Sequence, residues 1–131
     1  MRAAAVETKT STILCIDDEQ AVLQVRQALL ESAGYKVLAS KSGAQGIKAF
    51  QSEPVHAVVL DYWMSGMNGL QVAREIRKLD RSVPIVILSG YGELLNESLG
   101  IADVWIRKGE EDPQYLLDRL AQLLTRTRSS V

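Results

Sequence analysis

Residues 58–69 read V-V-L-D-Y-W-M-S-G-M-N-G, an apolar run that ends on Asp61 and then breaks into a glycine-containing loop. A continuous apolar run of this kind is typical of a strand that is covered on both faces, as in a parallel sheet. A carboxylate at the end of a buried strand is costly unless a cation or hydrogen-bond donors stabilise it. The rest of the sequence should therefore contain the partners of Asp61, and their chemistry indicates a function.

Further apolar runs, and the segments between them, predict an alternating α/β domain. The predicted strands cover residues 13–16, 35–39, 55–60, 84–88 and 104–106, with 35–39 at a sheet edge. Between and after these strands, apolar residues recur at the spacing of a helix. The four predicted helices contain Val22, Val25 and Leu29; residues 44–50; Val72, Ile76 and Leu79; and Leu116, Leu120 and Leu123. An Asp112-Pro113 pair is the predicted cap of the last one. This alternation implies βαβ units and one parallel sheet with helices on both faces.

Length and composition indicate a single globular domain of 131 residues. We expect a flexible segment over residues 1–11, the domain over 12–126 and a loose tail over 127–131. A net charge of -1 gives no support for direct binding to nucleic acid or to a membrane surface. Cys15 is the single cysteine, which excludes an internal disulfide and fits a cytoplasmic location.

Polar residues follow four of the predicted strands, at the edge where open parallel sheets bind ligands. The first strand leads into the acids at 17–19, the third ends in Asp61, the fourth in Ser89, and the fifth leads to Lys108. Each has an ordinary alternative role, as a helix cap, a turn residue or a solvated charge. Together, however, the acids repel one another unless a cation joins them, and oxygen ligands of this number suit Mg²⁺.

Mg²⁺ commonly holds phosphate as well as carboxylate, and this predicts phosphoryl chemistry at Asp61. One oxygen of Asp61 can bind the metal while the other attacks phosphorus in line. The Lys108 ammonium and the Ser89 hydroxyl are then suited to the new negative oxygens of an acyl phosphate.

Four stretches in order closely resemble the signatures of response-regulator receiver domains. They are I-L-C-I-D-D-E at 13–19, V-V-L-D-Y-W-M-S-G-M-N-G at 58–69, P-I-V-I-L-S-G at 84–90 and A-D-V-W-I-R-K-G at 102–109. The resemblance runs from about residue 12 to residue 124. It implies a flavodoxin-like (βα)5 doubly wound parallel sheet with strand order 2-1-3-4-5.

The resemblance also implies a phosphoacceptor and a metal site. Asp61 would take a phosphoryl group from the phosphohistidine of a sensor histidine kinase or a phosphotransfer protein. Asp17, Asp18, Asp61 and the backbone carbonyl of Trp63 would hold Mg²⁺. The chain would be no enzyme beyond its own Mg-dependent phosphorylation and slow dephosphorylation.

A conformational switch is implied in the same way. Ser89 and Lys108 would bind the phosphoryl group, and Trp105 would be the switch aromatic residue. The signal would leave through the surface of the fourth helix, fifth strand and last helix, towards an unknown output protein. The resemblance allows a weak homodimer through that surface.

Three features depart from the family pattern. Residues 65–66 are Ser-Gly where a proline is usual after the Asp-x-x-Met motif, and 108–109 are Lys-Gly in place of Lys-Pro, which leaves the isomer of that peptide open. The interval from Ser89 to Lys108 is short, so we expect a shortened fourth helix within 93–100. Trp63 and Tyr91 flank the expected path of the hydrolytic water, which predicts slow self-dephosphorylation.

Two other functions remain open. A phosphatase of the haloacid dehalogenase kind also uses an aspartate nucleophile, but it needs a second aspartate where this chain has Trp63. The stronger alternative is a degenerate receiver that binds proteins without being phosphorylated, which the altered residues at 65–66 and 108–109 favour.

Overall fold

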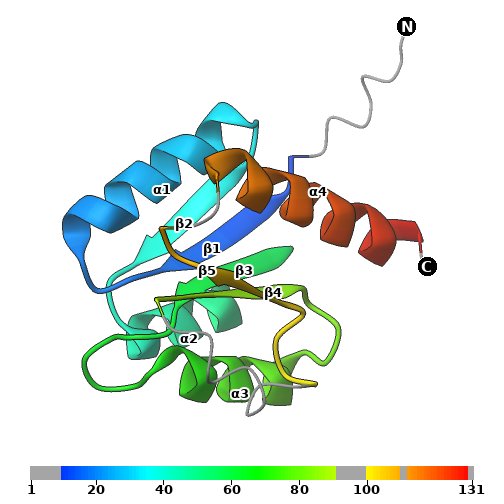
Figure 1. Cartoon of the computed structure of the whole chain (residues 1–131). Helices are drawn as coiled ribbons and strands as arrows, with labels where there is room; N and C mark the ends of the chain where they lie inside the picture. Colours follow the sequence, from blue (N-terminus) through cyan, green and yellow to red (C-terminus); the bar gives the residue numbers. More distant parts are fainter. Residues whose placement is uncertain (1–9, 91–99, 110–111, 130–131) are drawn as a thin grey trace, which may run out of the picture.

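Five short strands rich in branched apolar residues pair in parallel, with helices on both faces of the sheet (Figure 1). The computed structural model describes residues 10–90, 100–109 and 112–129. The elements are β1 (Thr12–Ile16), α1 (Gln20–Ser32), β2 (Lys36–Ser40), α2 (Gly43–Ser52), β3 (Ala57–Asp61), α3 (Gly69–Leu79), β4 (Ile85–Ser89), β5 (Val104–Arg107) and α4 (Pro113–Ser129). The strand order β2-β1-β3-β4-β5 confirms the predicted flavodoxin-like topology.

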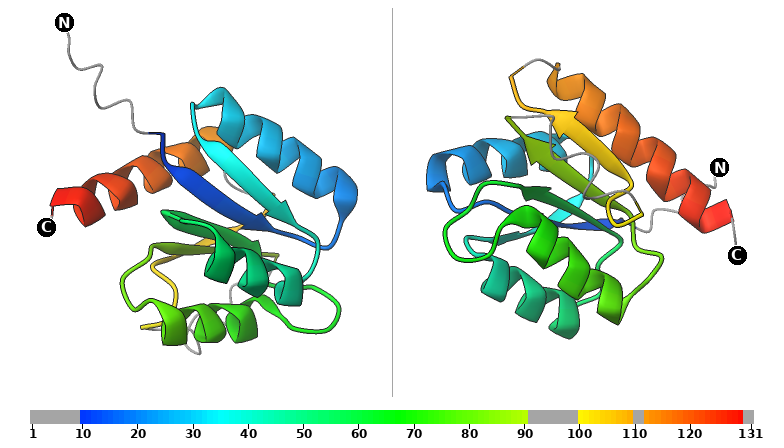
Figure 2. Two further views of the ribbon diagram at one scale, coloured as in Figure 1. Left: turned by 180° about the vertical axis from the view of Figure 1, so that it is seen from behind. Right: turned by 60° about the horizontal axis from the view of Figure 1, so that its bottom comes forward.

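Alternate residues of each strand enter two separate layers of core. Ile13 and Cys15 point towards α1 and α4, whereas Leu14 and Ile16 point towards α2 and α3. The two views in Figure 2 show these helix pairs on opposite sides of the sheet. Because both faces are covered, β1, β3 and β4 are buried along their whole length, which explains their continuous apolar sequences.

Helix ends agree with the sequence in two places. Gly34 follows α1 with φ +97°, a conformation that favours glycine, and its N–H donates to the carbonyl of Glu31 at 2.9 Å. The predicted cap of α4 is also present, since the N–H of Gln114 donates to Asp112 Oδ1 at 2.8 Å.

The rotation of α1 differs from the one that its most apolar stripe suggests. Leu23 and Leu30 face the core, whereas Val25 is 71% exposed and Val22 and Leu29 are only partly covered. Each buried leucine contributes about 2 kcal/mol of hydrophobic stabilisation, and packing two of them against the sheet decides the rotation.

The last helix extends further than the sequence predicts. Helix α4 continues to Ser129, so the helix reaches into the segment 127–131 for which the sequence predicts a loose tail. No glycine or proline follows Pro113 to stop the helix earlier. The shortened helix expected within 93–100 falls almost entirely outside the described residues, as do residues 1–9. No helix in the described ranges is long and apolar enough to cross a membrane.

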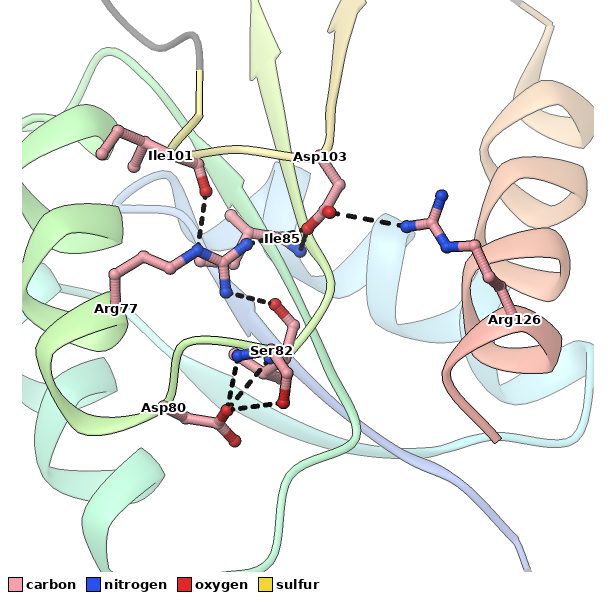
Figure 3. A network of polar contacts seen from close by, with 8 residues as sticks. Arg77, Asp80, Ser82, Ile85, Ile101, Asp103 and Arg126 are labelled. Atoms are coloured by element: carbon pink, nitrogen blue, oxygen red, sulfur yellow. Dashed lines mark hydrogen bonds and ion pairs between the residues drawn. The ribbon is translucent and has the colours of Figure 1, made fainter. Parts of the chain in front are cut away.

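A polar network joins α3, β4, β5 and α4 at the amino ends of the strands (Figure 3). Arg77 of α3 donates to the carbonyls of Ile101 and Val83, at 2.9 and 2.5 Å, and to Asp103 Oδ2 at 2.9 Å. The same oxygen of Asp103 accepts the N–H of Ile85 at 2.8 Å, and Arg126 of α4 lies 3.6 Å from the other. This network fixes the entry into β5 against its neighbours.

Candidate functional site

Asp61 lies at the carboxyl end of β3 with only 3% of its surface exposed. Its Oδ1 accepts a hydrogen bond from Lys108 Nζ at 2.5 Å, which makes an ion pair between two strand ends. The backbone N–H of Lys108 donates to the carbonyl of Ser89 at 2.8 Å, so the sheet pairing itself positions this lysine. The Lys108–Gly109 peptide is trans, and Gly109 takes φ +83°. The chain thus brings the ammonium to Asp61 without the usual proline.

The charge of Asp61 is only partly compensated. Burial raises the pKa of the Asp61 carboxyl above its ordinary value, and the hydrogen bond and charge of Lys108 oppose that rise. Asp17 adds a nearby negative charge that raises the pKa further, whereas Arg26 lowers it. The carboxylate is therefore held in a place where additional positive charge would stabilise it.

The loop after Asp61 folds back tightly onto β3. The N–H of Gly69 donates to the carbonyl of Tyr62 at 2.8 Å, and a Cβ at position 69 would lie 2.6 Å from the Asp61 carbonyl oxygen. Asn68 and Gln71 form a capping box that starts α3 at this point. Only glycine allows this close approach, so Gly69 sets the position of the loop beside Asp61.

Asp18 is tied to that loop by Ser65. Its Oδ2 accepts the backbone N–H of Ser65 at 2.9 Å and the Ser65 hydroxyl at 3.0 Å. The backbone hydrogen bond is the main reason that the pKa of the Asp18 carboxyl is lowered. A proline at this position has no N–H to donate, so the Ser-Gly departure in the sequence creates a contact that the usual residue cannot make.

Asp17 is bound to a residue that the sequence analysis did not select. Arg26 Nη1 of α1 donates to Asp17 Oδ2 at 2.9 Å, and the N–H of Glu19 donates to Oδ1 at 2.9 Å. Asp17 is 1% exposed and the Arg26 side chain 10% exposed. The sequence carries only a weak signal, because Leu23, Arg26 and Leu30 share one helix face, but the wholly apolar stripe of Val22, Val25 and Leu29 competes with it.

Ser89 and two tryptophans complete the predicted site residues that the structure describes. Ser89 ends β4 and is buried at the same edge as Asp61. Trp63 is 54% exposed, and its ring meets that of Tyr62 edge-on at 4.9 Å. Trp105 is half-buried, with its ring 5.8 Å from Tyr62, and its Nε1 has no hydrogen-bond partner among the described residues. Tyr91 lies outside the described residues.

The donor set fits a hard cation with few protein ligands. Within the described ranges, no three carboxylate, imidazole or thiol groups come close enough to hold a metal ion together. Asp18 nevertheless has an oxygen beyond those in the contacts described above, and Asp61 Oδ1 keeps a second lone pair beside the one that Lys108 uses. Because Mg²⁺ needs only one or two carboxylates and retains several waters, these residues are suited to Mg²⁺ and not to zinc.

A groove of about 470 Å³ opens beside Lys108, between α1 and the start of α4. Its lining is mainly apolar and includes Val22, Val25, Leu29 and Leu116. The partly exposed stripe of α1 therefore borders this groove, and Lys108 joins it to Asp61.

Comparisons with known proteins identify the family of the chain. A family model described as the response regulator receiver domain matches residues 13–103. The transcriptional regulatory protein GlrR of Escherichia coli K12 is 34% identical over 86 residues, which cover 66% of this chain and 19% of that protein. The chain thus matches about a fifth of the length of that relative.

Solved structures show the same fold over nearly the whole chain. A CheY-like receiver domain protein from Methanospirillum hungatei JF-1 has a TM-score of 0.87 at 25% identity, covering 94% of this chain and all of that one. The response regulator TrrA of Thermotoga maritima, in complex with Mg²⁺ and BeF, has a TM-score of 0.81 at 29% identity, covering 87% and 99%. With its fold, its strand-end acids and its matching family model, the chain belongs to the response regulator receiver domains of two-component signalling.

Proposed function

We propose that this receiver accepts a phosphoryl group on Asp61, in a Mg²⁺-dependent reaction, from the phosphohistidine of a sensor histidine kinase or phosphotransfer protein. The observation that carries the proposal is the Asp61–Lys108 pair, in which Lys108 holds Oδ1 at 2.5 Å and leaves Oδ2 as the nucleophile. The carboxylate is fixed by β3 and buried, so little motion is needed to present it.

The transfer forms one bond and breaks another. Asp61 Oδ2 attacks phosphorus as the phosphorus–nitrogen bond breaks, and the imidazole leaves with the electron pair. Lys108 stabilises the negative charge of the acyl phosphate, and Ser89 is suited to donate its hydroxyl to a phosphoryl oxygen. Bound Mg²⁺, held by Asp18, Asp61 and the carbonyl of Trp63, supplies further positive charge for the phosphoryl oxygens.

Mass measurement after incubation with acetyl phosphate and Mg²⁺ tests the proposal. We expect the wild type to gain one phosphoryl group and Asp61→Ala to gain none, with Asp80→Ala as a matched control far from the site. An unmodified wild type, or modification of Asp61→Ala, would contradict the proposal and favour a receiver that binds partners without phosphorylation.

The groove between α1 and α4 is the proposed approach for the phosphodonor, because it reaches Lys108 directly. Val25 is 71% exposed at its border. Val25→Asp should therefore slow transfer from a phosphorylated kinase by about ten-fold and leave the reaction with acetyl phosphate unchanged. Equal slowing with both donors would mean that the substitution damages the site and not the docking surface.

The proposed output runs through Trp105 and the surface of β5 and α4. Trp105 contacts Tyr62, which follows Asp61 directly, so a change at the acid can reach the indole. We expect the bulky indole to move less than the usual tyrosine or phenylalanine. Beryllofluoride with Mg²⁺ should change the fluorescence of Trp63→Phe, in which Trp105 is the remaining tryptophan, and no change would argue against this route.

The lifetime of the phosphoryl group is proposed to be long. In the sequence, Trp63 is two residues after Asp61 and Tyr91 is two residues after Ser89. If both obstruct the hydrolytic water, Trp63→Asn and Tyr91→Glu should each lose the phosphoryl group faster than the wild type. Unchanged decay in both variants would refute the obstruction.

A further inference from the structure

Arg26 is a cation placed within a buried apolar stripe. It lies between Leu23 and Leu30 on the face of α1 that packs on the sheet, and its side chain is only 10% exposed. Its one ion pair among the described residues is with Asp17, at 2.9 Å. Buried ion pairs are often no more stabilising than apolar side chains of similar size, so stability alone does not account for it.

The contact with Arg26 removes Asp17 from the set of carboxylates that can bind a metal. Both oxygens of Asp17 accept protein donors, one from Arg26 and one from the N–H of Glu19. A metal at Asp17 would compete with Arg26 for the carboxylate and would lie beside the positive charge of the guanidinium, which is buried and needs its counter-ion. The acid edge therefore presents Asp18 and Asp61 as direct ligands.

Arg26 also affects the charge that an incoming cation meets. Its positive charge lies at this edge of the sheet, since its guanidinium is 2.9 Å from Asp17 Oδ2. Together Arg26 and Lys108 offset two of the three carboxylates at this edge. A divalent cation is attracted to a site of net charge about -1, where three free carboxylates would give -3.

We propose that Arg26 is a built-in counter-ion that withholds Asp17 from the metal and lowers the affinity of the acid site for divalent cations. This inference rests on the proposal that Asp18 and Asp61 hold Mg²⁺. Arg26 acts through Asp17 and is a positioning residue. Because the site then binds Mg²⁺ more weakly, its Mg²⁺ occupancy depends more strongly on the Mg²⁺ concentration than it would if Asp17 were available. Readiness for phosphorylation depends on that concentration in the same way.

Calorimetric titration of the whole chain with Mg²⁺ alone tests this. Arg26→Met should bind Mg²⁺ about ten-fold more tightly than the wild type, because a charge is removed and Asp17 becomes available. Arg26→Gln removes the charge but keeps a donor for Asp17, and should also gain affinity. It supplies the same comparison if the methionine variant does not fold.

A double-mutant cycle shows whether the effect passes through Asp17. In an Asp17→Asn background, Arg26→Met should lose most of its ten-fold gain, because no carboxylate remains at position 17 to be released. Two controls keep the charge argument specific: Arg26→Lys, which retains the charge, and Lys78→Met, which loses an exposed charge on α3, should both stay within two-fold of the wild type.

Unchanged or weaker Mg²⁺ binding by a folded Arg26→Gln would overturn the inference, as would a gain that survives Asp17→Asn. The proposed function is judged separately by mass. Phosphorylation of Asp61 together with unchanged Mg²⁺ affinity in the Arg26 variants would refute only the proposed counter-ion role of Arg26. Tighter Mg²⁺ binding in those variants, with no phosphorylation of any of them or of the wild type, would refute only the proposal that Asp61 accepts a phosphoryl group.

Discussion

The two ends of the sheet use the same kinds of residue to opposite effect. At the amino ends, Asp103 and Arg77 satisfy each other and several backbone groups, so that Arg77 alone makes three hydrogen bonds. At the carboxyl ends, three carboxylates share two cations, and burial raises the pKa of Asp61.

The two networks differ in how many of their charged and hydrogen-bonding groups have partners. A fully paired network stabilises the fold, because removing any member leaves buried partners without a hydrogen bond. A partly paired cluster costs stability, but its remaining carboxylate oxygens are available to bind cations and phosphate. The amino-end network is therefore structural, and the carboxyl-end cluster is the place for chemistry. Substitutions at four positions, with one control, test this contrast.

Arg77→Met should have the largest effect, a loss of about 3 kcal/mol in the free energy of unfolding, because two carbonyls and Asp103 lose their donor. Urea denaturation measures it. Lys78→Met is the control, since the Lys78–Glu75 pair is exposed and should be worth less than about 0.5 kcal/mol. Equal effects of the two substitutions would contradict the claim that the fully paired Arg77 network stabilises the fold more than an exposed ion pair does.

Asp61→Asn should instead stabilise the protein, by about 1 kcal/mol at pH 7, because it removes an incompletely paired buried charge. The pKa of Asp61 is higher in the folded state than in the unfolded chain, so the wild-type penalty is present at neutral pH. It disappears as the pH falls through the raised folded pKa, and the two unfolding curves should then converge. If Asp61→Asn were less stable than the wild type at pH 7, the charge of Asp61 would stabilise the fold, as the paired groups at the amino ends do.

Ser65 variants should shift the titration of Asp18 with little change in stability. Ser65→Ala removes the hydroxyl, and Ser65→Pro removes both donors, so the pKa of Asp18 should rise in the first and rise further in the second. Because the folded pKa is lowered, the stabilisation from Asp18 is present above its unfolded pKa and is lost as pH falls through the folded value. Carboxyl-carbon NMR titration measures both shifts, and identical titrations in the wild type and both variants would show that the Ser65 contacts do not lower the Asp18 pKa.

Arg126→Gln should have the smallest effect, a change of about 0.3 kcal/mol or less. Arg126 is 67% exposed and lies 3.6 Å from Asp103, whose other oxygen already has two donors. Urea denaturation beside Arg77→Met gives the comparison within a single network. A loss as large as that of Arg77→Met would mean that the network depends on its outer member.

The sequence predicted the fold and the residues that stand directly at strand ends. Asp61 and Lys108 follow from the positions of apolar runs, because parallel strands bring their carboxyl ends together. Arg26 and Ser65 could not be predicted in this way. The contact of Arg26 depends on the rotation of α1, where a wholly apolar stripe competed with the stripe that is buried, and that of Ser65 depends on the path of a backbone amide.

The division of the core by the sheet has a consequence for how the domain can change. The buried side chains beneath α1 and α4 share no member with those beneath α2 and α3. Substitutions on the two faces, such as Leu30→Ala and Ile76→Ala, should therefore add in their effects on unfolding to within about 0.5 kcal/mol. The helices around the groove beside Lys108 can thus accumulate mutations, and so acquire new partner specificity, without repacking the layer under α3.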